Sequence, residues 1–165
     1  ELFQLRAQLE RELASRGKSF SVGEVGERLA VTFFASQPGL PRLVNAPRGA
    51  KNVDALSKDG DRYSIKTVMR AKKTGTVYPD SLERDKQLFE YLLVVQLDEN
   101  FELQCIHRFS WKQFLAARAW DKRMNAWYVP VSKVTLKKGE QLYPTSKNQA
   151  VHPVECGRGS ATDSM

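Results

Sequence analysis

An aspartate and a lysine stand 12 residues apart, on either side of a segment that is typical of a tight β-hairpin. Asp54 sits at the end of a short strand expected over residues 52–56, and Lys66 lies in the return strand expected over residues 62–68. The Asp-Gly pair at residues 59–60 favours a tight turn between these strands. Paired strands would bring the carboxylate and the ammonium to one spot at the same edge of a sheet.

These residue types fit phosphodiester hydrolysis. Magnesium is a hard cation that takes carboxylate and carbonyl oxygens and usually keeps several waters. Asp54 can supply a carboxylate, the main chain of Ile65 a carbonyl, and an acid on the preceding helix, Glu24 or Glu27, a third oxygen. A metal ion acidifies a bound water and stabilises charge on the phosphate. Lys66 beside that water can orient it and offset the developing negative charge.

Three short segments carry a resemblance to a known family. They are GEVGERLA on an expected helix, NVDAL, and RYSIKTV, and FEYLLVVQLDENFELQCIHRF follows as a pair of core strands. Over roughly residues 20–110 the chain resembles the PD-(D/E)XK nuclease superfamily, of the type II restriction endonuclease kind. The resemblance implies a restriction-endonuclease-like α/β core with a mixed β-sheet flanked by helices, a Mg²⁺ site and DNA as the substrate. Asp54 matches the metal-binding aspartate, Lys66 the catalytic lysine, and Glu27 or Glu24 the helical glutamate of many members.

One position departs from the family pattern. The second carboxylate of the family falls at position 64, which is Ser64 in this chain. Some members move this acid to the helix, where Glu24 or Glu27 would replace it, and the Ser64 hydroxyl could hold a metal-bound water. Otherwise the site has lost a ligand, and the chain is a catalytically inactive nuclease fold that only binds DNA.

The elements that must position these residues follow from hydrophobic spacing. Leucines recur at helical spacing over residues 2–16, and a second helix follows a serine cap at Ser19 or Ser21. Gly23 and Gly26 lie early in that helix, where glycine costs about 1 kcal/mol each, so we expect a close packing partner there. Residues 36–50 are rich in proline and glycine and predict a loop.

The second half of the chain predicts further helices and strands. We expect a short helix over 81–87, strands over 88–97 and 101–109, a helix capped by Ser110, and a last short strand over 126–129. The order of elements predicts one layered α/β domain over residues 1–145. Residues 146–165 form a polar tail that we expect to be flexible or partner-dependent.

The charge of the chain favours a polyanionic partner. The formal net charge is +7, and residues 108–147 hold 9 basic against 2 acidic residues. Such a concentrated basic excess is typical of nucleic-acid binding, although a solvated basic surface would look the same. Aromatic and basic residues interleave around Trp111, Trp120 and Trp127, and we expect Trp111 and Trp127 to belong to the core. The residues expected to contact DNA are Arg48, Lys51, Arg70, Lys72, Lys73, Arg118, Lys122, Arg123 and Asn125.

Several other classes are disfavoured. No apolar run approaches the ~18 to 20 residues that cross a bilayer, and no Gly-rich phosphate loop is present, so neither a membrane nor a nucleotide cofactor is expected. Two cysteines make no disulfide framework, which favours the cytoplasm. Cys105 and His107 with His152 and Cys156 could form a zinc site, but the spacers are unlike the usual knuckle.

The sequence therefore predicts a Mg²⁺-dependent, sequence-specific double-stranded DNA endonuclease similar to type II restriction enzymes. A palindromic target needs two sites, so we expect a homodimer, with the first helix as one possible contact. A restriction function would also require host protection by a methyltransferase. Two alternatives remain, an inactive DNA-binding module and a structural or partner-binding protein without a nucleic-acid role.

Overall fold

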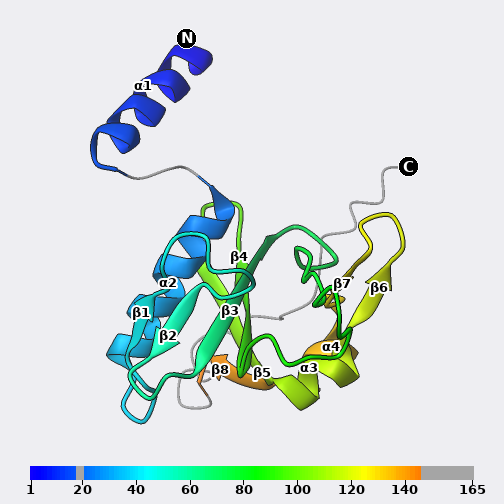
Figure 1. Cartoon of the computed structure of the whole chain (residues 1–165). Helices are drawn as coiled ribbons and strands as arrows, with labels where there is room; N and C mark the ends of the chain where they lie inside the picture. Colours follow the sequence, from blue (N-terminus) through cyan, green and yellow to red (C-terminus); the bar gives the residue numbers. More distant parts are fainter. Residues whose placement is uncertain (18–20, 146–165) are drawn as a thin grey trace.

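The computed structural model describes residues 1–17 and 21–145 as four helices and eight strands (Figure 1). In chain order these are α1 (Leu2–Ser15), α2 (Val22–Ser36), β1 (Leu43–Asn45), β2 (Ala55–Ser57), β3 (Arg62–Met69), β4 (Tyr91–Leu97), β5 (Leu103–Ser110), α3 (Trp111–Ala117), β6 (Ala119–Asp121), β7 (Ala126–Tyr128), α4 (Lys133–Leu136) and β8 (Glu140–Tyr143).

Six strands form one mixed sheet in the order β1-β2-β3-β4-β5-β8. Only β3 and β4 pair in parallel, and the other neighbours are antiparallel. A separate two-stranded hairpin pairs β6 with β7. The predicted mixed α/β sheet with flanking helices is confirmed at this level.

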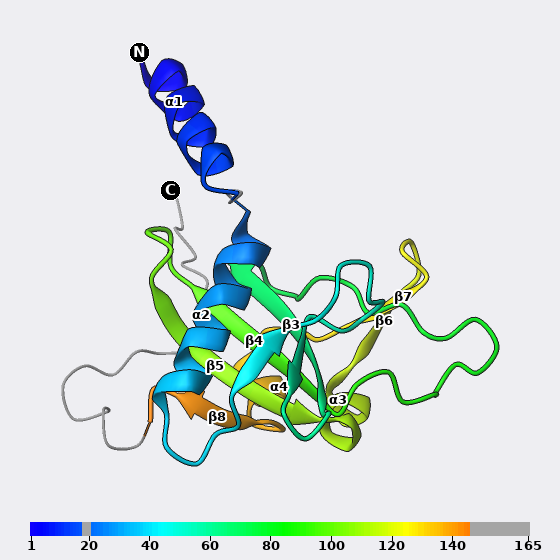
Figure 2. The same ribbon diagram turned by 60° about the vertical axis from the view of Figure 1, so that its left-hand side comes forward.

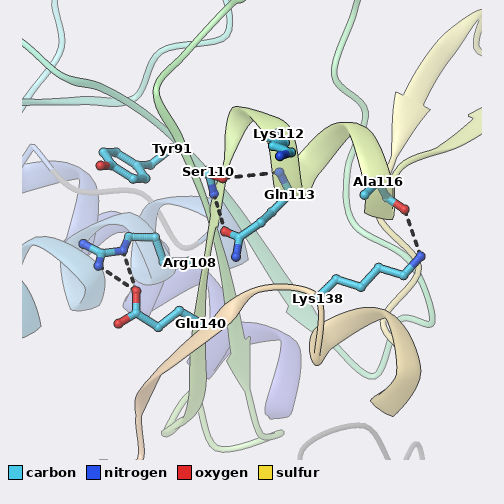
Figure 3. Close-up of a pocket in the computed structure, with 8 residues that line it drawn as sticks. All are labelled: Tyr91, Arg108, Ser110, Lys112, Gln113, Ala116, Lys138 and Glu140. Atoms are coloured by element: carbon cyan, nitrogen blue, oxygen red, sulfur yellow. Dashed lines mark hydrogen bonds and ion pairs between the residues drawn. The ribbon is translucent and has the colours of Figure 1, made fainter.

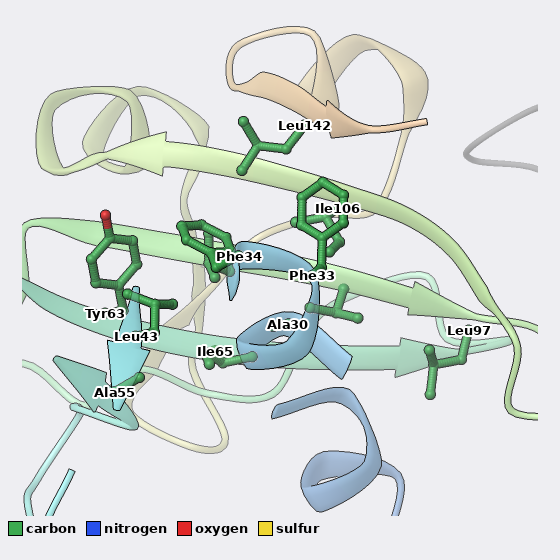
Figure 4. Close-up of a cluster of buried hydrophobic side chains, with 12 residues drawn as sticks. Ala30, Phe33, Phe34, Leu43, Ala55, Tyr63, Ile65, Leu97, Ile106 and Leu142 are labelled. Atoms are coloured by element: carbon green, nitrogen blue, oxygen red, sulfur yellow. The ribbon is translucent and has the colours of Figure 1, made fainter. Parts of the chain in front are cut away.

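Helix α2 covers one face of the sheet (Figures 1 and 2). Its Ser21 cap accepts a hydrogen bond from the backbone N–H of Glu24. Phe33 and Phe34 from α2 pack with alternate strand residues such as Ile65 and Leu93 in one apolar cluster (Figure 4). The helix axis is thereby held directly over β3.

The opposite face of the sheet carries a second apolar cluster. Leu92 and Val94, which alternate with the residues of the first cluster, pack here with Phe89 and with Phe114 of α3. The sequence of a strand that is buried on both faces is a continuous apolar run, which explains the unbroken hydrophobic stretch of β4. Ser110 and Gln113 form the capping box that begins α3, as the serine predicted.

The expected helix over residues 81–87 is wrong. This segment forms turns, and the Asp80 carboxylate accepts hydrogen bonds from the backbone N–H groups of Leu82 and Glu83. Side-chain bonds of this kind compete with helix formation, and Leu82 is almost fully exposed, so no apolar face holds a helix here. The structure also contains four short elements that the pattern did not predict: β1, β6, α4 and β8.

Helix α1 is confirmed, but it lies apart from the sheet in both views (Figures 1 and 2). None of its residues is buried, and Leu2 is 81% exposed. Its leucines therefore do not serve the core of this domain. Among the helices at residues 1–17 and 21–145, none is long and apolar enough to span a bilayer.

Candidate active site

The β2–β3 hairpin holds Asp54 against β3. The backbone N–H of Asp54 donates to the carbonyl of Tyr63 at 2.8 Å, and its own carbonyl accepts from Ala46 at 2.9 Å. Oδ2 of Asp54 accepts from the backbone N–H of Ile65 at 2.6 Å and lies 3.4 Å from the Ser64 hydroxyl. Oδ1 accepts none of the hydrogen bonds found among the described residues. The carboxylate is thus fixed by one oxygen and presents the other.

Glu27 approaches the same place from helix α2. Its pKa is raised above the ordinary value by partial burial, then by the negative charges of Asp54 and Glu24, while the positive charge of Lys66 lowers it. Charge interactions weaken with distance and are screened by solvent, so these influences require proximity. From α2, Glu27 is therefore within reach of the charge of Asp54, the residue before β2, and also of the charge of Lys66 on β3.

Close packing explains how Glu27 reaches the hairpin. A Cβ atom on Gly26 would lie only 1.9 Å from Oγ1 of Thr67, so α2 approaches β3 more closely than any larger residue would allow. Gly23 has no such neighbour within 4 Å. Only one of the two predicted close-packed glycines is required by the fold, and it directly precedes Glu27.

Lys66 is half-buried on β3 without a carboxylate held against it. Its ammonium forms no ion pair or hydrogen bond with any residue in the described ranges. On β3, Ile65 belongs to the cluster under α2 and Val68 to the opposite cluster, so Ser64 and Lys66 share the side of Val68. Since Ser64 contacts Asp54, the amine and the carboxylate do not lie on opposite sides of the sheet.

The oxygen atoms near Lys66 match the preference of Mg²⁺ in kind. Asp54 and Glu27 supply carboxylates and Ile65 a main-chain carbonyl, and Mg²⁺ is commonly held by one or two carboxylates with its remaining positions filled by water. Burial raises the pKa of Glu27 most, and the negative charge of Asp54 raises it further; a divalent cation would relieve that repulsion. Even so, the described residues include no group of three or more His, Cys, Asp or Glu side chains arranged to hold a metal ion.

Ser64 and Glu24 take secondary places in this arrangement. Ser64 is fully buried, and its 3.4 Å contact with Asp54 is a weak hydrogen bond. Glu24 lies in the exposed first turn of α2, one helical turn before Glu27. Glu27 is half-buried, and the charge of Asp54 helps to raise its pKa, which makes it the stronger candidate of the two helical acids.

The residues predicted to contact DNA fall into two groups. Those in loops and in the β6–β7 turn are exposed: Arg48, Lys51, Lys72, Lys122, Arg123 and Asn125. Arg70 pairs with Glu99, and Lys73 pairs with Asp121. Arg118 is different, because its side chain is 14% exposed, pairs with Asp85 at 2.7 Å and lies 3.8 Å from the centre of the Trp127 ring. These contacts give Arg118 a structural role within the domain.

A groove is lined by two residues predicted to contact DNA, Lys51 and Asn125, and by two that were not predicted, Tyr78 and Arg84. Tyr78 and Arg84 border a cavity of about 460 Å³ together with Lys51, Trp120 and Asn125. Tyr78 and Arg84 lie in an irregular segment without periodicity, so no local pattern marked them. The nearby tryptophans were the only signal, and Trp111 and Trp127 pack against the core as expected.

A second cavity of about 610 Å³ lies between β5, α3 and the start of β8 (Figure 3). Three of its four charged side chains have partners within the domain. Arg108 pairs with Glu140 at 2.6 Å, and the Lys138 ammonium donates to the carbonyl of Ala116 at 2.8 Å. It contains none of the predicted site residues.

The zinc alternative gains no support from the described part of the chain. His107 is buried on β5, and burial lowers its pKa to about 4, so it is neutral at physiological pH. His152 and Cys156 lie outside the described residues.

Comparison with known proteins adds no relative to this picture. No protein-family model matches the chain, and no curated protein matches its sequence. Any assignment of function therefore follows from the residues and contacts of the hairpin, α2 and the groove.

Proposed function

We propose that this chain is a Mg²⁺-dependent, sequence-specific double-stranded DNA endonuclease with a restriction-endonuclease-like core, similar to type II restriction enzymes. The observation that carries the proposal is the Asp54 carboxylate held against β3 by the Ile65 N–H at 2.6 Å, between Ser64 and Lys66 in the chain, with the charge of Asp54 helping to raise the pKa of Glu27. The half-buried Lys66 has no ion pair among residues 1–17 and 21–145, and neither Glu27 nor Asp54 is paired with a cation there, so these charges have no evident structural use. Together they are the groups that metal-assisted hydrolysis of a phosphodiester needs.

Each residue has a separate task in this proposal. Asp54, Glu27 and the carbonyl of Ile65 would hold the metal, which when bound acidifies a water and stabilises negative charge on the phosphate. The Ile65 N–H fixes the orientation of Asp54 through Oδ2. Lys66 orients the attacking water and offsets negative charge on the phosphate oxygens. Ser64 supports Asp54 only weakly, and Glu24 adds negative charge near Glu27.

The fold and the charge support the same proposal. Helix α2 lies directly on β3, and the Asp-Gly hairpin sets β2 beside β3. The exposed basic residues of the loops and the β6–β7 turn would bind the phosphate backbone of DNA. We propose one nuclease-like domain over residues 1–145 and a homodimer for a palindromic target, with the exposed apolar residues of α1 as a candidate contact.

Plasmid cleavage tests the proposed reaction. We expect supercoiled DNA to be cut with Mg²⁺ and left intact with EDTA. Asp54→Asn and Lys66→Ala should each reduce the rate by at least ~100-fold, the scale seen when a group that stabilises transition-state charge is removed. Lys112→Ala, an exposed lysine of the cavity in Figure 3, is the matched control and should cut at the wild-type rate. Cleavage that survives both site substitutions would disprove the assignment.

A second candidate is a catalytically inactive DNA-binding module. Ser64 favours it, because this position carries a carboxylate in the family that the chain resembles. If the chain binds DNA but does not cut it with any of the divalent cations tested, it is the inactive binding module and not the enzyme. For the enzyme, we expect Ser64→Ala to retain activity within about tenfold, since the 2.6 Å bond from Ile65 continues to hold Asp54.

A further inference from the structure

The groove bordered by Lys51, Tyr78, Arg84, Trp120 and Asn125, called here the aromatic groove, has the composition of a nucleotide site. Its volume of about 460 Å³ lies within the range of ~300 to 1,000 Å³ that is common for small-molecule sites. It has planar groups, positive charge and an amide. Asp80, its one acidic lining residue, already accepts two backbone hydrogen bonds and lies 3.6 Å from Lys86.

The aromatic groove adjoins the proposed active site. Lys51 stands three residues before Asp54, and the side chain of Asn52 donates to the carbonyl of Tyr78 at 3.2 Å. This bond ties the groove wall to the segment that delivers Asp54. A DNA strand at Asp54 would therefore meet the groove within a short length of its backbone.

Planar side chains lie in contact with one another at the groove, where Trp120 and Arg84 line it and Trp127 packs against both. The Trp120 and Trp127 rings meet edge to face with centres 4.5 Å apart, and the Arg84 guanidinium lies 4.1 Å from the centre of Trp120. Arg118 supports Trp127 from within the domain. Two backbone bonds between Val77 and Trp127, of 2.7 and 2.9 Å, fix this strand pair beside Tyr78.

Two groups of the groove are available to a ligand. Arg84 is exposed and makes no ion pair within residues 1–17 and 21–145. Tyr78 is 41% exposed. Nucleobases stack on aromatic rings and on arginine guanidinium planes, and in a duplex those base faces are already occupied. The planar groups therefore suit a base that has left the double helix.

We propose that the aromatic groove binds an unpaired nucleotide of the DNA strand held at Asp54, so that duplex DNA containing a single-stranded segment is cut in preference to fully paired duplex. The base stacks against Arg84 and Tyr78, Asn125 hydrogen-bonds its edge, and Lys51 binds an adjoining phosphate. The inference rests on the proposed function in taking DNA as the substrate class and in placing the strand at Asp54.

Binding measured without cleavage tests this inference. The full chain carrying Asp54→Asn is titrated at ~0.15 M salt into a single strand containing 2-aminopurine, and into the matching duplex. We expect the single strand to bind at least ~10-fold more tightly and its fluorescence to be quenched by stacking. Tyr78→Ala and Arg84→Ala should each weaken single-strand binding roughly 5- to 100-fold, as expected for the loss of one stacking partner. Arg84→Lys keeps the positive charge but removes the planar guanidinium, and it should weaken single-strand binding nearly as much as Arg84→Ala does.

Lys112→Ala serves as the control and should bind like the parent, with circular dichroism confirming that every variant is folded. Equal affinity for duplex and single strand, or unchanged binding in both Tyr78→Ala and Arg84→Ala, would overturn the inference. The two proposals fail separately. A wild-type chain that prefers single strands yet never cuts refutes the endonuclease alone, whereas cutting with unchanged groove variants refutes the groove alone.

Discussion

At the residue scale, the close approach of Glu27 and Asp54 is unfavourable in the absence of a cation. Burial and the charge of Asp54 raise the pKa of Glu27, so the folded chain holds this proton more tightly than the unfolded chain does. The charged Glu27 therefore costs stability, and the cost grows as the pH rises from the ordinary value of 4.5 through the folded pKa. A carboxylate kept at such a cost is typical of a functional site.

This cost predicts the effect of neutralising Glu27. In EDTA at pH 7, Glu27→Gln should raise Tm, and below pH 4 the gain should vanish because both forms of the residue are then neutral. Mg²⁺ should raise the Tm of the wild type and have a smaller effect on Glu27→Gln. Calorimetry across pH measures both, with the exposed Glu102→Gln as the control. A lower Tm for Glu27→Gln at pH 7 would show that the carboxylate is instead a stabilising structural group.

At the element scale, the contact between α2 and β3 decides the geometry of the site. Gly26 faces Thr67 with no room for a Cβ, and the next residue is Glu27. Glycine lowers the intrinsic stability of a helix, so the cost is offset here by the packing it permits. The position of Glu27 over the hairpin depends on this contact.

Two glycines of the same helix offer a matched pair of substitutions. Gly26→Ala should destabilise the fold by about 1–3 kcal/mol through overpacking, and it should weaken the Mg²⁺-dependent rise in Tm because α2 must move. Gly23→Ala meets nothing within 4 Å and should stabilise by up to about 1 kcal/mol. Urea unfolding of both variants measures the difference. The packing argument would be contradicted if Gly26→Ala did not lower the free energy of unfolding, or if the two variants had the same free energy of unfolding.

At the scale of the whole molecule, the net charge of +7 predicts salt-dependent binding to DNA. Affinity should fall steeply as salt rises, and each phosphate contact removed should lower the slope of log K against log salt by about 1. Lys51→Ala and Arg123→Ala should each show this change, while Arg11→Ala on the separate helix α1 should not. Fluorescence anisotropy at several salt concentrations measures the slopes. A slope near zero for the wild type would favour the structural class without a nucleic-acid role.

Local chemistry made much of the fold predictable. The Asp-Gly turn, the serine caps of α2 and α3 and the continuous apolar run of β4 each correspond to an observed element. The helix expected over residues 81–87 does not form, because the segment has no apolar face to bury. The Asp80 carboxylate instead accepts hydrogen bonds from the backbone N–H groups of Leu82 and Glu83. The short strand β8 could not be predicted from local spacing, because it pairs with β5, which lies far away in the chain.

The sequence by itself predicted the hairpin that sets Asp54 beside Ser64 and Ile65, because a tight turn dictates which residues of its two strands lie opposite each other. It also determined the alternation that buries both faces of β4. Only the tertiary structure decided that the charge of Asp54 acts on Glu27, that Arg118 pairs with Asp85, and that Arg84 and Tyr78 border a groove. These choices depend on contacts between segments distant in the chain, and local spacing carries no information about which segments pack together.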